Sequence, residues 1–270
     1  MKTIRKYSSL MRVRFTNGMQ YRAAALAGVV TQFAWGGMYL LLYRTFYQAG
    51  TGAFPMDMQA LSAYIWLQQA FLALFMVWGM DNDIFELITS GNIAYELCRP
   101  CDLYSMIFVR TLGSRLAKAA LRCFPILIVT AFLPAPYGMR LPPTWEAAGL
   151  FLLSFTLGAL VVAAFCMLIY TSAFFTISPM GVRLIAVSVV DFLSGAIVPL
   201  PFFPKGLQTV FSLLPFGSMQ NMPFRIYGGD LAGTQAIAGI IVQAFWLTVL
   251  ILIGRLLMQR ALRRIVIQGG

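Results

Sequence analysis

The chain contains no histidine and few charged residues of any kind. Asp, Glu, Lys and Arg make up 11% of the 270 residues, whereas apolar residues make up 60% and the mean hydropathy is +0.78. Soluble domains carry about 25% charged residues, so this chain has too few charges to cover a water-facing surface. We therefore expect lipid to surround much of it.

The missing histidine also excludes whole classes of chemistry. The usual zinc sites, Ser-His-Asp triads and H-E-x-x-H proteases all need that side chain, and the chain has no Walker A sequence. We expect no catalytic residue, no metal site, no cofactor and no ATP hydrolysis on this chain. Cys98 and Cys101 form an isolated C-x-x-C pair, which we interpret as coincidence because no second pair and no βαβ pattern accompany it.

The net charge of +11 has two possible explanations. A basic chain can bind nucleic acid, but here the positive residues flank apolar stretches, where the positive-inside rule places them. We therefore expect membrane lipid, and no nucleic acid, among its partners.

Six apolar stretches are long enough to be transmembrane helices, each of which needs about 20 residues. We predict an all-α polytopic membrane protein whose six spans occupy residues 23–43, 60–80, 115–134, 147–175, 184–203 and 236–253. They form one transmembrane domain over residues 23–258, in the inner or plasma membrane.

The distribution of lysine and arginine predicts the orientation of these spans. Sixteen of the 20 lysines and arginines lie on one side of the predicted membrane and four on the other. Positive residues concentrate in cytoplasmic segments, so we expect both termini in the cytoplasm, which requires an even number of spans; six satisfies this.

Both ends of the chain lie outside the predicted spans. In residues 1–22, apolar side chains recur at three- and four-residue steps among basic ones, which predicts an amphipathic helix at the membrane surface. Its apolar positions are Ile4, Tyr7, Met11 and Phe15. We predict a cytoplasmic tail over residues 259–270.

The segment 81–102 is the main polar part of the chain. It holds five of the nine acidic residues and only one basic residue, Arg99. Ile84 and Ile88 lie on one helical face and Gly91 offers a stop, so we predict a short amphipathic helix. Its acidity would repel an anionic membrane surface, which favours a protein partner.

The segment 199–230 contains five prolines, and its apolar piece 207–216 is too short to cross a membrane. Because proline interrupts helices, we predict a pair of short helices that dip into the outer leaflet as a re-entrant hairpin.

A few polar residues lie inside the predicted spans. Asp191 is the single acid there, and intramembrane acids are often functional; it is equally suited to pair with Arg122 or Lys118. Gln68, Gln69 and Arg122 are further candidates for a substrate pathway or for interhelical hydrogen bonds. For Arg110 and Arg115 we expect snorkelling to the headgroups.

These parts resemble the six-span permeases of ABC-2 type exporters. The likeness rests on the basic lead-in, on the sequence ITSGN at 88–92 followed by ELCRP at 96–100, on Ser194-Gly195 with Pro199, Pro204 and Leu214-Pro215, and on the small size without an ATPase domain. It covers nearly the whole chain.

The resemblance implies a complex in which two permeases, identical or related, form a dimer above two cytosolic ATPase subunits that hold ATP and Mg²⁺. The loop 81–102 would then couple the two layers. The residues that would contact the ATPase are Asp83, Glu86, Leu87, Gly91, Glu96 and Arg99.

Two other functions fit the residues alone. Asp191 could carry a proton in a secondary transporter driven by an ion gradient. The chain could also be a non-transporting membrane scaffold or immunity protein.

Overall fold

The computed structural model describes residues 2–50, 54–176 and 178–263, and only the backbone of residues 2–4. Within these ranges all regular structure is helical, as predicted, with twelve α-helices and one 3-10 helix. The helices are α1 (Lys2–Gly18), α2 (Arg22–Gln48), α3 (Met58–Ala70), α4 (Leu72–Phe75), α5 (Asn82–Thr89), α6 (Ile93–Leu97), α7 (Leu103–Ala131), α8 (Trp145–Ser172), α9 (Pro179–Leu193), η1 (Leu200–Phe202), α10 (Lys205–Leu213), α11 (Asn221–Gly228) and α12 (Gly233–Leu262).

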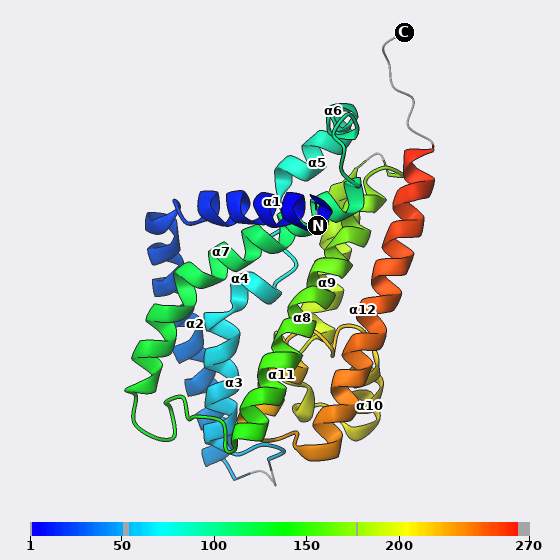
Figure 1. Cartoon of the computed structure of the whole chain (residues 1–270). Coiled ribbons are helices and arrows are strands. Elements are labelled where there is room, and N and C mark those ends of the chain that lie inside the picture. The colour runs from blue at the N-terminus through cyan, green and yellow to red at the C-terminus, as the bar shows by residue number, and fades with distance from the viewer. Residues whose placement is uncertain (1, 51–53, 177, 264–270) are drawn as a thin grey trace.

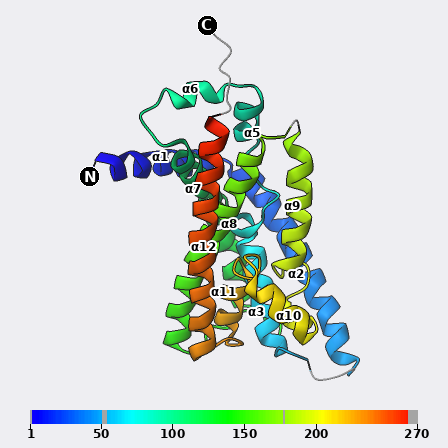
Figure 2. The same cartoon turned by 90° about the vertical axis from the view of Figure 1, so that its right-hand side faces the viewer.

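The longer helices run along a common axis (Figures 1 and 2). Helices α2, α7 and α9 run from the end where α1, α5 and α6 lie, here called the α5 end, to the opposite end, called the α10 end. The segment α3–α4, α8 and α12 run back in the other direction. The chain thus passes along the bundle in alternating directions, in the order expected for the predicted spans.

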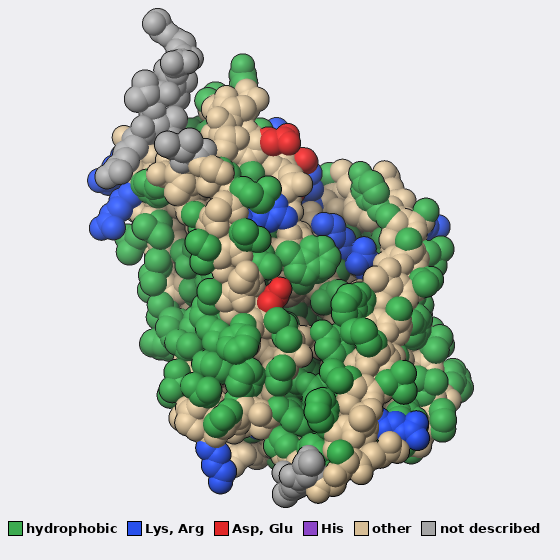
Figure 3. All heavy atoms as spheres, turned by 180° about the vertical axis from the view of Figure 1, so that it is seen from behind, with side chains coloured by type: hydrophobic (Ala, Val, Ile, Leu, Met, Phe, Trp, Pro, Cys, Tyr) green, Lys and Arg blue, Asp and Glu red, His purple; other side chains and the backbone are tan. Residues whose placement is uncertain are grey.

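Three helices, α2, α8 and α12, are long and apolar enough to cross a membrane. The other three passes differ for physical reasons. Helices α3 and α9 have only 13 and 15 residues, and the 29-residue α7 carries Arg110, Arg115, Lys118 and Arg122. Hydrophobic side chains nevertheless cover the middle of the molecule, and Lys and Arg gather towards the α5 end (Figure 3).

The second predicted span, 60–80, is wrong as one continuous helix. The helix breaks at Phe71, and α4 ends at Phe75. The freed carbonyls of Leu74 and Met76 accept hydrogen bonds from Nη1 of Arg115, at 3.0 and 2.6 Å. A helix break inside an apolar bundle persists only where another group binds the freed backbone, and Arg115 supplies that group.

The third predicted span, 115–134, overlaps a longer helix that begins before it. Helix α7 starts at Leu103, where the Asp102 carboxylate accepts hydrogen bonds from the backbone N–H and the hydroxyl of Ser105, at 2.9 and 2.6 Å. A cap of this kind fixes a helix start. The predicted start came from counting about 20 residues, the length that crosses a membrane, back from Pro134. The helix itself has 29 residues and is longer than that.

The last two predicted spans also have different bounds. Helix α9 ends at Leu193 rather than 203, because Gly195 adopts a left-handed φ of +77° that ends the helix. Helix α12 continues to Leu262, so the predicted tail cannot begin at 259; residues 264–270 of that tail lie outside the described part. The fourth span agrees with α8 within three residues at each end.

The amphipathic lead-in is a helix, α1, and it lies across the long helices at the α5 end (Figure 1). It crosses α7 closely: a Cβ at Gly113 would lie 3.2 Å from the Met11 carbonyl, and one at Gly18 would lie 2.5 Å from Cβ of Ala117. The inner face of α1 therefore packs on protein, with Tyr7, Met11 and Phe15 partly buried.

The predicted pair of short helices in 199–230 is present as α10 and α11. Helix α11 is buried over its whole length and packs against α3 and α8. The Phe224 ring meets Tyr64 edge-on at 5.4 Å. Helix α10 is largely exposed, with only Phe211 buried.

Buried Gln243 joins three parts of the bundle. From α12, its Nε2 donates to the backbone carbonyls of Ser154 and Ser218, at 3.1 and 2.8 Å. Its Oε1 lies 2.8 Å from the Ser154 hydroxyl, which donates to it. One amide thus links α8, α12 and the segment before α11.

We expect Gln243→Leu to lower the free energy of unfolding by about 1–2 kcal/mol, because it removes three interhelical hydrogen bonds from an apolar interior. Thermal unfolding of the detergent-purified protein measures this. The exposed Gln235 on the same helix gives the control Gln235→Leu, and equal stability of the two variants would contradict the assigned role.

Candidate functional site

Helix α5 is a short amphipathic helix. The Asp81 carboxylate accepts a hydrogen bond from the Asp83 backbone N–H at 3.1 Å and so caps the first turn. Ile84, Phe85 and Ile88 are buried and belong to the main hydrophobic core. The helix is therefore held on the bundle by its apolar face, and its acidic face is turned outward.

Arg110 ties α5 to α7. Its guanidinium forms ion pairs with Asp81 at 2.9 Å and with Asp83 at 3.1 Å. The Arg110 side chain is 9% exposed, whereas that of Asp83 is 75% exposed. Pairing at a buried cation is stronger than at a solvated one, so this contact fixes the first turn of α5.

Two further helices hold the same segment. The Tyr170 hydroxyl of α8 accepts a hydrogen bond from the Asp81 N–H at 2.7 Å. Arg183 of α9 donates to Asn82 Oδ1 at 2.8 Å and to the Trp78 carbonyl, and it lies 5.8 Å from the centre of the Phe85 ring. Helices α7, α8 and α9 thus converge on one turn of α5.

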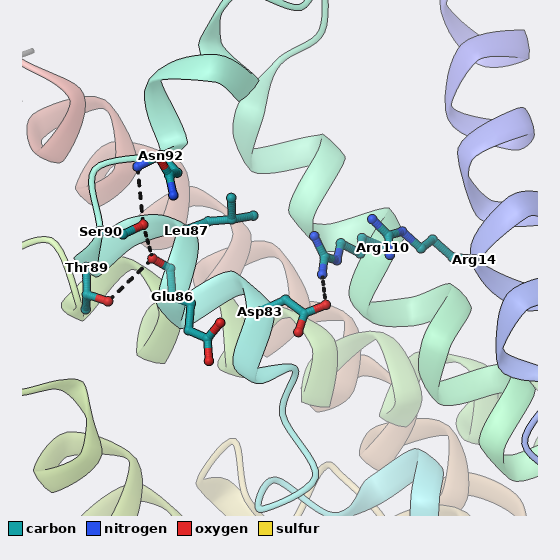
Figure 4. Close-up of a pocket in the computed structure, with 8 residues that line it drawn as sticks. All are labelled: Arg14, Asp83, Glu86, Leu87, Thr89, Ser90, Asn92 and Arg110. Carbon is teal, nitrogen blue, oxygen red and sulfur yellow. Dashed lines mark hydrogen bonds and ion pairs between the residues drawn. The ribbon is translucent and has the colours of Figure 1, made fainter. Parts of the chain in front are cut away.

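A cavity of about 620 Å³ opens beside the outer face of α5 (Figure 4). Glu86 lines it and is exposed, and within the described residues its carboxylate has no ion pair. Leu87 lines the same cavity and packs partly on the core. Arg14 lies on the far side, next to Arg110 (Figure 4); burial and the positive charge of Arg110 lower the pKa of Arg14.

The remaining predicted coupling residues lie further along the segment. Gly91 has a φ of +76° directly after α5, so it acts as the predicted stop. A second short helix, α6, follows Gly91, whereas the sequence predicted only one helix in this segment. Glu96 and Arg99 form an ion pair at 3.2 Å, and the Arg99 side chain is 60% exposed.

A second cavity, of about 330 Å³, lies between α2, α3–α4 and α9, and it brings together three of the residues predicted for a pathway. Gln68 donates to the Ala196 carbonyl. Gln69 and Asp191 line the cavity, and neither has a side-chain hydrogen bond or ion pair within the described residues. The rest of the lining is mixed. Its aromatic and polar residues are Trp35, Tyr39, Phe75, Trp78, Ser194 and Gln220, and its other apolar residues are Leu72, Met76, Val190, Ala196 and Ile197.

Arg122, the fourth predicted pathway residue, lies elsewhere. It lines a separate cavity near α1, together with Lys118, and no ion pair joins either of them to Asp191 in the described residues. The expectation that Arg110 and Arg115 snorkel to headgroups is wrong: they are 8% and 3% exposed, because acidic side chains and backbone carbonyls of the bundle bind them. Within the described ranges, no three His, Cys, Asp or Glu side chains cluster as metal ligands.

The comparison with known families agrees with this arrangement of an apolar bundle and an acidic helix at one end. Residues 33–269 match the family described as "ABC-2 family transporter protein". The chain belongs to the ABC-2 transporter family. It is therefore a membrane permease component of an ABC transporter, and permeases of this kind lack ATPase activity themselves. Among curated proteins, no sequence matches this ABC-2 permease.

Sequence reasoning missed the residues that hold α5 in place. Arg110, Tyr170 and Arg183 lie on three helices up to 105 positions from their partners. The acidity of the loop beside the basic start of α7 was a signal that some pairing occurs. It could not show which cation meets which carboxylate.

We expect Arg110→Gln to destabilise the permease by about 2 kcal/mol, because it removes charge-assisted hydrogen bonds to two carboxylates. Amide hydrogen exchange should rise over 82–97, where α5 loses its anchor. The control is Arg99→Gln at an exposed pair, which should cost at most about 0.5 kcal/mol. Unchanged exchange in Arg110→Gln would show that the apolar face alone holds α5.

Proposed function

We propose that this chain is the permease subunit of an ATP-driven exporter or flippase, and that separate ATPase subunits bind it at α5 and α6. The proposal rests on one observation: α5 is bound to the bundle on one side and exposed on the other. Its buried face and first turn are bound to the bundle, while the exposed Glu86 carboxylate has no ion pair within the described residues and lies beside an open cavity. Such a helix has one side for the permease and one side for a partner.

The alternating passes of the helices support six spans, with the α5 end in the cytoplasm. Both described ends of the chain, α1 and the end of α12, lie at the α5 end (Figure 2). Basic residues gather there too, as the positive-inside rule requires of a cytoplasmic face. The α10 end, with the buried α11, would then be the outer face and would contain the re-entrant hairpin.

A second permease, identical or related, would complete the pathway. Helix α9 supports this because Val190 is its single buried residue and most of its surface is apolar. The large exposed side chains there are Met180, Leu184, Ile185, Val189 and Phe192. Lipid or a second permease would cover them, and two ATPase subunits, with ATP and Mg²⁺, would sit below such a dimer.

The anchoring of α5 suggests how ATP-driven motion would reach the spans. A displacement of α5 would pull on α7 through Arg110, on α8 through Tyr170 and on α9 through Arg183. Side chains from Asp191 and Ser194 of the α9 segment line the cavity that also contains Gln69. Movement of α9 would therefore change the shape of that cavity.

We expect Glu86→Lys to weaken association with the ATPase, because it reverses a charge that is exposed and unpaired in the permease alone. The measurement is co-purification of the tagged complex from its membrane in mild detergent, with mass spectrometry of the bound subunits. A fall of roughly tenfold corresponds to about 1.4 kcal/mol.

The matched control for this experiment is Glu146→Lys. Glu146 is an exposed glutamate in the first turn of α8, at the α10 end. If both variants retain the ATPase equally, α5 is not the docking helix.

The cavity around Asp191 also fits the alternative in which an ion gradient drives transport. An unpaired carboxylate in an apolar bundle can carry a proton. Membership in the ABC-2 family favours ATP as the energy source. It also disfavours a non-transporting scaffold or immunity protein. On our proposal Asp191 lines the substrate path.

We expect Asp191→Asn to slow ATP-dependent translocation of a fluorescent amphipathic dye or a labelled phospholipid by roughly tenfold in proteoliposomes, since about 1.4 kcal/mol of interaction is lost. Binding of the ATPase should be unaffected, and Glu146→Gln serves as the control. Translocation that follows an imposed pH gradient without ATP would instead support the ion-driven alternative.

A further inference from the structure

A cavity of about 560 Å³ lies between α1, α2 and α7 at the α5 end. It is separate from the cavity that contains Asp191 and plays no part in the proposed transport path. Basic side chains from two helices line it, together with hydroxyl groups. The basic side chains include those of Arg14, Lys118 and Arg122, and the hydroxyl groups include those of Tyr21 and Ser114.

The charges around this cavity do not balance. Asp81 and Asp83 also line it, but Arg110 binds both carboxylates. Within the described residues, no ion pair or side-chain hydrogen bond engages Arg14, Lys118 or Arg122. Three cations thus face one space without a carboxylate of their own. Such an arrangement attracts an anion from outside the chain.

The Arg122 side chain is partly buried. Its guanidinium packs against Gly28 of α2, where a Cβ would lie only 2.8 Å from Cζ. Its Nε is buried and has no acceptor. An unsatisfied buried donor is costly, so a bound anion at this point would complete the hydrogen bonding of Nε.

The surface of α7 below the cations is apolar. Leu121 lines the cavity, and Phe124 and Ile128 follow it at three and seven residues, so they lie on the same side of the helix. Both are strongly exposed, by 64% and 57%. A molecule with a charged head in the cavity could therefore lay hydrocarbon chains along α7.

We propose that this cavity holds the phosphate of an anionic phospholipid, with Lys118 and Arg122 as its main ligands and the acyl chains against α7. Helix α1 lies across the bundle beside the cavity, as a helix at the membrane surface does. Basic pockets between transmembrane helices at the cytoplasmic side are suited to anionic headgroups. The site goes beyond the transport function and would position α1 against the lipid surface.

The test is lipid binding to the purified full-length permease in a neutral detergent, read by native mass spectrometry. Three probes are compared: a phosphatidylglycerol, a phosphatidylcholine with the same acyl chains, and inorganic phosphate. We expect retention of phosphatidylglycerol in preference to the other two, and loss of that preference at high salt. Equal retention of both lipids, or equal binding of inorganic phosphate, would overturn the assignment to an anionic lipid.

Substitutions then locate the site. Lys118 is exposed, so Lys118→Gln should fold normally and weaken phosphatidylglycerol binding about fivefold, and adding Arg122→Gln should weaken it about fivefold more. The control is Arg12→Gln, which removes an exposed cation of α1 that lies outside the cavity. If Arg12→Gln matches the Lys118 variant, the lipid responds to overall charge and the site is disproved.

Discussion

The fold depends on a buried guanidinium that binds the end of a broken helix. Arg115 reaches from α7 to the carbonyls of Leu74 and Met76, and its other terminal nitrogen lies 3.1 Å from Sγ of Cys166. In an apolar bundle, free carbonyls and a free cation would each be costly, and here each satisfies the other. The second pass can therefore end early, and the chain emerges towards α5 at a defined place.

The basic residues of α7 serve different purposes along one helix. Arg110 binds the acidic turn of α5, and Arg115 completes the broken helix one and a half turns further on. Lys118 and Arg122 then face a cavity whose two acidic lining residues, Asp81 and Asp83, are both bound by Arg110. Helix α7 has 29 residues and is long enough to span a membrane, but these four cations make it too charged to count as an ordinary apolar span. The first two cations bind groups of the bundle, and the last two are the proposed ligands of a lipid phosphate.

Helix α5 is held by the bundle at its first turn, whereas its outer face is accessible. The first turn of α5 is bound by α7, α8 and α9, so a force applied to its outer face would be carried into three helices rather than lost in a flexible loop. The cavity with Asp191 lies deeper, between helices that this force would reach. In the proposed docking role, the acidity of α5 would also discriminate between partners, because an anionic membrane would repel it while a cationic protein surface would not.

The sequence by itself determined the class of the protein, the order of its passes and the position of its acidic helix. These follow from hydrophobic runs, capping residues and glycines such as Gly91, which act over a few neighbouring positions. Only the tertiary structure decided that 60–80 breaks at Phe71 and that Arg110 and Arg115 are buried. It alone also placed Arg122 against Gly28, away from Asp191. These features depend on which helices face one another, and a run of hydropathy carries no information about a partner on another helix.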